Sequence, residues 1–152
     1  MSSPGAQAAL YVAGASGGAK DGVGRLVKLA GLDGTPESQF AANIAPASGM
    51  ADARATAIDS QGNVFVVGNT TGDFGSEIEQ GKQDVFLAKY DSAGNLLWTK
   101  LLGSAGTANG FSLALDPATQ GVVVAGSVTG DLKPDAIRSE EHTSELQSRF
   151  GI

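Results

Sequence analysis

The sequence predicts an all-β fold made of tandem four-stranded antiparallel sheets, and three observations support that prediction. Four apolar residues followed by glycine recur at Leu10–Gly14, Val64–Gly68 and Val122–Gly126, with a period of about 55 residues. The turn sequence Asp-Ser-x-Gly-Asn occurs at Asp59–Asn63 and again at Asp91–Asn95. The composition agrees, because 22 glycines beside 6% aromatic and 17% charged residues favour short strands joined by tight turns.

The middle copy of the repeat is complete and predicts four successive strands. These are Ala55–Ile58, Val64–Gly68, Asp84–Tyr90 and Leu96–Leu102. The second strand is continuously apolar, which indicates that both of its faces are buried. The two Asp-Ser-x-Gly-Asn turns suit hairpins, because Asp bonds the amides ahead of it and Gly and Asn accept left-handed backbone conformations. Four strands joined in this way form an antiparallel meander.

The flanking copies are partial. The first copy predicts strands at Leu10–Gly14 and Arg25–Leu29, a longer turn at Gly31–Gly34, and a weak strand at Phe40–Ile44. The third copy predicts strands at Phe111–Asp116 and Val122–Gly126, joined by the longer turn Pro117–Gly121, and reaches Asp135–Ile137 before the pattern stops. The links between second and third strands differ in length while the strands do not, as is typical of surface loops on a fixed frame.

Composition and charge exclude several classes of protein. The chain has 152 residues and a formal net charge of −6 at pH 7, so nucleic acid and anionic membranes are poor candidates for partners. Its apolar runs are far shorter than the ~20 residues of a membrane-spanning helix, and we expect no membrane insertion. There is no cysteine, which excludes disulfides, thiolate catalysis and cysteine-ligated metals.

A family resemblance extends these predictions. Ala57–Thr71 includes Asp-Ser-x-Gly-Asn-Val-Phe-Val-Val-Gly, and Asp84–Thr99 and Leu101–Gly103 complete the pattern. These segments resemble the SBBP family of bacterial β-propeller repeats, and Phe111–Ile137 and Ala8–Ile44 resemble it less closely. The resemblance implies a propeller of about seven blades, usually within a secreted or cell-surface bacterial protein. It implies no shared catalytic residues.

On this resemblance the chain is an incomplete β-propeller of about two and a half four-stranded antiparallel blades. Residues 8–50 are predicted to form a partial blade, residues 51–106 a complete blade and residues 107–137 a second partial blade. The remaining blades of the parent chain would be its natural partners. Because unpaired strands would be exposed at both ends, we expect the chain to self-associate.

The C-terminal segment breaks with the repeat. Arg138–Ser148 resembles a short-read sequencing adapter translated in one frame, so residues 138–152 are predicted to be a non-native tail. Taken as protein, the same stretch would be a solvated helix with Glu141 and Glu145 on one face. His142, the only histidine, lies in this segment and is assigned no function.

Two motifs imitate ligand sites. Val12–Ala19 resembles the dinucleotide-binding turn of short-chain dehydrogenases, but Gly22 and Gly24 oppose the helix that such a site needs. The pairs Asp59 with Asn63 and Asp91 with Asn95 could ligate calcium, although each turn offers few oxygens for that ion. Turn chemistry explains the same residues, and a calcium site combined from adjacent loops remains the minor alternative.

Acidic and aromatic residues supply the other candidates. Asp73, Glu77 and Glu79 could provide paired carboxylates for glycoside hydrolysis, but a solvated loop is the favoured interpretation. Trp98 and Tyr90 are expected to pack between blades or on a strand face rather than to form a ligand platform. We therefore assign no catalytic, cofactor-binding or metal-ligating residue to this chain and expect no cofactor.

The predicted function is that of a non-enzymatic propeller segment of a secreted or cell-surface bacterial protein, serving as a binding or display scaffold. Rigid blades would hold variable loops, such as Gly72–Gln83, at one rim for contact with protein or glycan. The alternative is a fragment of a propeller-framed enzyme, for example a polysaccharide-active one, whose catalytic residues lie outside this chain.

Overall fold

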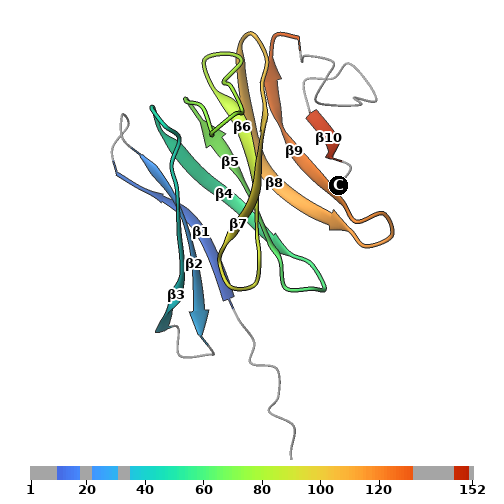
Figure 1. The fold of residues 1–152 in the computed structure, drawn as a ribbon. Helices are drawn as coiled ribbons and strands as arrows, with labels where there is room; N and C mark the ends of the chain where they lie inside the picture. Colours follow the sequence, from blue (N-terminus) through green and yellow to red (C-terminus); the bar gives the residue numbers. More distant parts are fainter. Residues whose placement is uncertain (1–9, 18–21, 31–34, 132–145, 151–152) are drawn as a thin grey trace, which may run out of the picture.

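The computed structural model describes residues 10–17, 22–30, 35–131 and 146–150, and the regular structure in these ranges is all β-strand (Figure 1). The strands form three antiparallel sheets, two of three strands and one of four. The predicted fold class is therefore confirmed: all-β, with tandem antiparallel blades of an incomplete propeller. Within the described ranges there is no helix long and apolar enough to cross a membrane.

Each sheet follows chain order, so strands that are consecutive in sequence are neighbours in space. The first sheet comprises β1 (Leu10–Ser16), β2 (Val23–Ala30) and β3 (Thr35–Ile44). The middle sheet comprises β4 (Ala51–Ile58), β5 (Val64–Thr70), β6 (Asp84–Tyr90) and β7 (Leu96–Leu102). The third sheet comprises β8 (Thr107–Asp116), β9 (Gly121–Thr129) and β10 (Leu146–Phe150).

The observed strands agree closely with the predicted ones. β6 and β7 have the predicted bounds, and the other predicted strands that the structure describes are longer than expected; β3 begins at Thr35 rather than at Phe40. The predicted turn at Gly31–Gly34 and the strand at Asp135–Ile137 lie outside the described residues, as do Glu141, Glu145 and His142. Within the adapter-like tail, β10 pairs with β9 at the position that β6 occupies beside β5.

The middle sheet buries both of its faces, as the apolar run of β5 predicted. Val64 and Val66 belong to a core shared with the first sheet, whereas Phe65 and Val67 belong to a core shared with the third sheet. Every residue of β5 is buried. Because burying one Val, Leu or Phe side chain contributes about 1.5–3 kcal/mol, these two cores hold the three sheets in a stack.

A β-bulge recurs in the first strand of the middle and third sheets. The strand register shifts between Ala53 and Ala55 in β4, and between Gly110 and Ser112 in β8. Each bulge faces the glycine that ends the apolar motif on the neighbouring strand. A Cβ on Gly68 would overlap the carbonyl oxygen of Asp52, and a Cβ on Gly126 would overlap that of Asn109. This shared contact is the physical reason for the glycine in the repeat.

The first sheet has no equivalent of β4 among the described residues, and its outer face is open. Leu10 and Val12 occupy the repeat positions of the buried Val64 and Val66, yet they are 58% and 45% exposed. In the other two sheets, the corresponding face packs against the preceding sheet. The open face therefore fits the third sheet of another copy, stacked in the same way.

We expect the chain to form oligomers and the Leu10→Lys/Val12→Lys double variant to sediment mainly as a monomer. A charged residue on this face would have to be desolvated in a stacked sheet, which is strongly unfavourable. Ile78→Lys is the control, because Ile78 is 58% exposed in a loop rather than on a sheet face. A monomeric wild-type chain in sedimentation velocity, or equal behaviour of the two variants, would contradict the prediction.

Candidate functional site

The two ends of the sheet stack carry different connections (Figure 1). At the lower end of that view lie the short turns that join β4 to β5, β6 to β7 and β8 to β9. At the upper end lies the longer loop between β5 and β6. Surface connections on a rigid frame are the usual location of binding sites, so both ends are candidates.

In the first two turns the side chain of the opening aspartate accepts the same three hydrogen bonds. Asp59 Oδ1 accepts bonds from the amides of Gln61 and Asn63 at 2.9 Å, and its Oδ2 accepts one from Asn63 Nδ2 at 2.8 Å. Asp91 repeats the network with Ala93 and Asn95, with all three bonds at 2.9 Å. These bonds are the turn chemistry that the sequence predicted for both motifs.

The carboxyl groups of both turns are held in their charged form. Burial acts to raise the pKa of Asp59, but the bonds from Asn63 and Gln61 and the charge of Lys89 outweigh it, so its pKa lies below the ordinary value. The pKa of Asp91 is also lowered, chiefly by the bonds from Asn95. Both turns therefore keep a negative charge at neutral pH, bonded to their own backbone.

The third turn is one residue longer and has no glycine at its left-handed position. Asp116 again opens it, bonding the amide of Ala118 at 2.9 Å and the hydroxyl of Thr119 at 2.6 Å. Two residues before the first apolar residue of the next strand stands Gln120, with a φ of 59°. The first two turns have Gly62 at 84° and Gly94 at 92° in this position. A non-glycine residue in this left-handed region costs about 1 kcal/mol or more.

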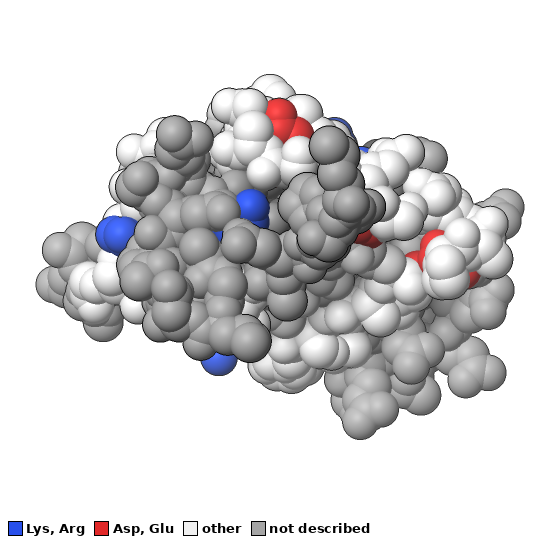
Figure 2. All heavy atoms as spheres, turned by 90° about the horizontal axis from the view of Figure 1, so that it is seen from below, with Lys and Arg blue, Asp and Glu red and all other residues white. Residues whose placement is uncertain are grey.

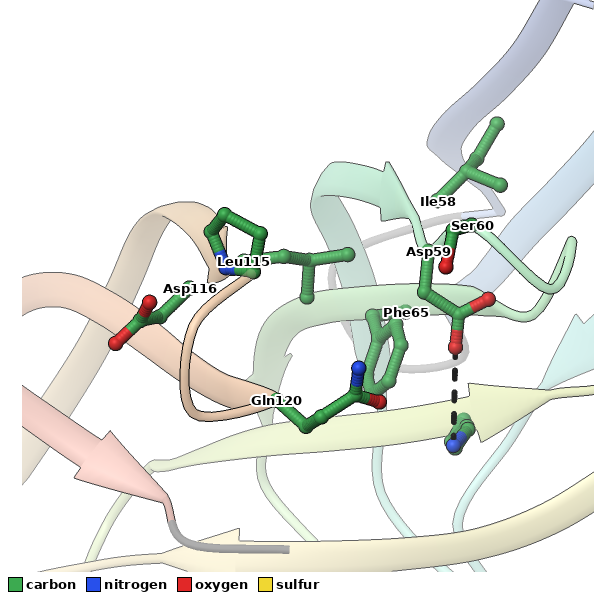
Figure 3. A pocket seen from close by; sticks show the side chains of 9 residues that line it. Ile58, Asp59, Ser60, Phe65, Leu115, Asp116 and Gln120 are labelled. Atoms are coloured by element: carbon green, nitrogen blue, oxygen red, sulfur yellow. Dashed lines mark ion pairs between the residues drawn. The ribbon is translucent and has the colours of Figure 1, made fainter.

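A pocket of about 530 Å³ lies between the first and third of these turns (Figure 3). It therefore spans the junction of the middle and third sheets, and its walls mix polar and apolar side chains. The lining residues are Ile58, Asp59, Ser60, Phe65, Lys89, Leu115, Asp116, Pro117 and Gln120.

The charges at the base of the pocket are paired. Lys89 Nζ lies 4.0 Å from Asp59 Oδ2 and 4.9 Å from the centre of the Phe65 ring, an ion pair and a cation–π contact. Both charged side chains are largely withdrawn from solvent, at 15% and 17% exposure. Trp98 packs edge-on against Phe65, with ring centres 6.1 Å apart, which agrees with the packing role expected for it. The paired charges therefore leave the pocket floor nearly neutral.

Comparison with known proteins identifies the element that builds one wall of this pocket. Residues 57–75 match the sequence model of the SBBP family, whose description is Beta-propeller repeat. The chain carries an SBBP β-propeller repeat. Its matched segment includes Ile58, Asp59, Ser60 and Phe65, so a single repeat supplies the wall contributed by the first turn and β5.

A curated relative shares a longer stretch with this chain. The Regulatory protein FlaEY of Caulobacter vibrioides is 49% identical to it over 57 residues, which are 37% of this chain and 6% of that protein. The chain thus spans a small part of that relative's length.

The loop between β5 and β6 is held against the sheet by its own contacts. Asp73 Oδ1 accepts a bond from the amide of Glu79 at 2.7 Å, and Glu77 pairs with Lys100 at 3.1 Å. Phe74 packs on Phe86, with ring centres 5.5 Å apart. The three acids named from the sequence thus lie in one loop, where Asp73 and Glu77 bond its backbone and an adjacent strand.

Asp84, at the start of β6, anchors the end of this loop and was not identified from the sequence. Its side chain is fully buried; Oδ2 accepts a bond from the amide of Gln80 at 2.7 Å, while Oδ1 has no hydrogen-bond partner. Burial raises its pKa, against the lowering effect of the Gln80 and Gly81 amides. Burial, together with the charges of Asp84 and Asp73, also raises the pKa of Glu79.

Neither of the two motifs that imitate ligand sites has the structure that its ligand would need. β1 and β2 pair antiparallel from Leu10 with Leu29 to Ser16 with Val23. The glycine-rich stretch therefore joins two strands of a hairpin, whereas a dinucleotide site needs a strand followed by a helix. In the described part of the chain, no group of three or more acidic or histidine side chains is placed to hold a metal ion. Figure 2, which views the turn end, shows basic and acidic side chains scattered among uncharged ones on its described surface.

Tyr90 completes the residues singled out from the sequence. It is 4% exposed in the core shared with the first sheet, and burial raises the pKa of Tyr90 to about 12.

Gln120 was not identified from the sequence, because no local pattern marks it. The available signal was its position, since the other two turns have glycine where the third turn has glutamine.

Proposed function

We propose that this β-propeller segment acts as a non-enzymatic binding scaffold in a secreted or cell-surface bacterial protein, with protein or glycan as its partner. The observation that supports this most directly is the pocket of about 530 Å³ between adjacent sheets. Ligand pockets have volumes of about 300–1,000 Å³ and often lie where two units of structure meet. The extracytoplasmic location is drawn from the resemblance to SBBP proteins.

The frame supports binding because it holds the pocket walls before a ligand arrives. Both faces of β5 are buried, and the turns at Asp59 and Asp116 bond their own amides. A wall that is already ordered loses little conformational entropy when a ligand binds. We therefore expect the pocket to bind with little rearrangement.

The charged groups favour binding over acid–base catalysis. Asp59 accepts three N–H bonds and pairs with Lys89, so most of its acceptor capacity is used within the protein. A general base needs an accessible acceptor within reach of a substrate proton. Asp116 is likewise bonded to Ala118 and Thr119 in its own turn.

An array of glycans and peptides probed with the labelled chain tests this function. We expect wild type to bind at least one class of ligand, and Ser60→Trp to abolish the binding because the indole would fill the pocket. Ser92→Trp is the matched control, since Ser92 occupies the same position in the turn at Asp91 and does not line the pocket. Absence of wild-type binding, or equal binding by the two variants, would refute the proposal.

A further inference from the structure

Gln120 retains a side chain where the backbone favours glycine. Among the described residues it is the one non-glycine with a positive φ, and the equivalent positions of the other two turns are Gly62 and Gly94. Glycine adopts this conformation without steric strain. Residues with strained backbone conformations cluster at active sites and ligand-binding sites. The Gln120 side chain lines the pocket and extends from its turn toward Phe65 and Asp59 (Figure 3).

Two uncharged polar side chains, those of Gln120 and Ser60, line the pocket beside the carboxylates of Asp59 and Asp116. Asp59 is paired with Lys89, and Asp116 is bonded within its own turn. The amide of Gln120 and the hydroxyl of Ser60 both line the pocket and belong to exposed residues. An amide and a hydroxyl both donate and accept hydrogen bonds, so they suit a ligand whose polar groups do the same.

The rest of the wall is apolar, and the whole chain is acidic. Ile58, Leu115 and Pro117 supply aliphatic surface beside the polar groups. A ligand that fits must combine hydroxyl groups along one edge with an apolar face. The net charge of −6 disfavours anionic polymers. These requirements describe an uncharged sugar ring, which presents hydroxyls at its edge and C–H groups on its face.

We propose that this pocket binds an uncharged pyranose unit of a glycan. The sugar hydroxyls bond the amide of Gln120 and the hydroxyl of Ser60, while the C–H face of the ring rests on Leu115 and Pro117. This inference rests on the proposed binding function and names its ligand class.

Titration of the ¹⁵N-labelled full chain with glucose, galactose and N-acetylglucosamine, followed by amide chemical shifts, tests the inference. We expect at least one sugar to shift amides in both pocket turns, and Gln120→Gly to weaken its affinity by about tenfold or more. The same variant should melt at a higher temperature than wild type, because glycine relieves the left-handed strain. Gln61→Gly, in the exposed part of the first turn, should leave sugar affinity unchanged.

A higher melting temperature together with a weaker sugar affinity in Gln120→Gly would distinguish a ligand-binding role of Gln120 from a structural one. Equal sugar affinity of Gln120→Gly and wild type would overturn the inference, as would tighter binding of glucuronic acid than of the neutral sugars. If the array detects a peptide whose binding Ser60→Trp blocks, while neutral sugars shift no pocket amide, the sugar inference fails and the binding function stands. If no array ligand binds, the binding function itself fails.

Discussion

Gly68→Ala is expected to destabilise the protein by about 3 kcal/mol or more, at the upper end of the overpacking range. The added Cβ would overlap the carbonyl oxygen of Asp52 on β4 and lie 2.7 Å from the Phe86 ring. Neither neighbour can move easily, because the first is backbone held by the β4–β5 ladder and the second is fully buried. Since small domains are stable by only about 5–15 kcal/mol, such a loss could prevent folding at 37 °C.

The matched control is Gly14→Ala. Gly14 ends the same apolar motif in β1, but no atom lies within 4 Å of the position where its Cβ would stand. We expect this variant to be neutral, or more stable by about 0.4–1 kcal/mol, because alanine restricts the unfolded chain. Urea denaturation followed by the fluorescence of Trp98 measures both variants. Equal stabilities of Gly68→Ala and Gly14→Ala would show that the carbonyl group of Asp52 in the β4 bulge is not the reason for the glycine at position 68.

Asp84→Ala is expected to destabilise the protein by roughly 2 kcal/mol or more at every pH. The amide of Gln80 would lose the acceptor of a partly buried hydrogen bond, and leaving a buried donor unsatisfied costs about 1–3 kcal/mol. The end of the β5–β6 loop would detach from β6. Hydrogen exchange of the Gln80 and Gly81 amides should accelerate more than that of the β6 amides.

Asp84→Asn should change the pH dependence of stability instead. Because burial raises the folded-state pKa of Asp84 above its ordinary value, the contribution of this group is fully present below the ordinary pKa and is lost as the pH rises through the raised value. The side chain that replaces Asp84 in the Asp84→Asn variant does not titrate in this pH range. The stability of Asp84→Asn relative to wild type should therefore increase as the pH rises above the ordinary carboxyl pKa of about 4.

Denaturation curves of wild type and Asp84→Asn at several pH values in that range provide the measurement. Asp59 and Asp91 titrate in the opposite sense, since their lowered pKa values add stability that is lost as the pH falls, but they are common to both proteins. The difference between the two curves therefore isolates Asp84. A difference that stays constant with pH would mean that Asp84 is not held in a raised-pKa environment.

Much of the sheet structure could be predicted from short stretches of sequence. The bounds of β6 and β7 and the turns at Asp59 and Asp91 follow from residues within a few positions of each other. Strand alternation, β-branched side chains and Asx-type turns act over one or two hydrogen bonds, so neighbouring residues contain the necessary information. The sequence correctly predicted that Asp73 and Glu77 lie in a loop. It did not predict their hydrogen bonds, because these are made to β7 and to the backbone of the loop.

The amino-acid sequence by itself determined that this protein consists of tandem antiparallel sheets with SBBP-type strands and turns. Only the tertiary structure decided that Asp84 is buried, why Gly68 and Gly126 must be glycine, and that Gln120 lines a pocket with Asp59 and Ser60. The physical reason is range: turns and strand pairing depend on adjacent residues, whereas burial, close backbone contact and pocket shape depend on how separate sheets stack.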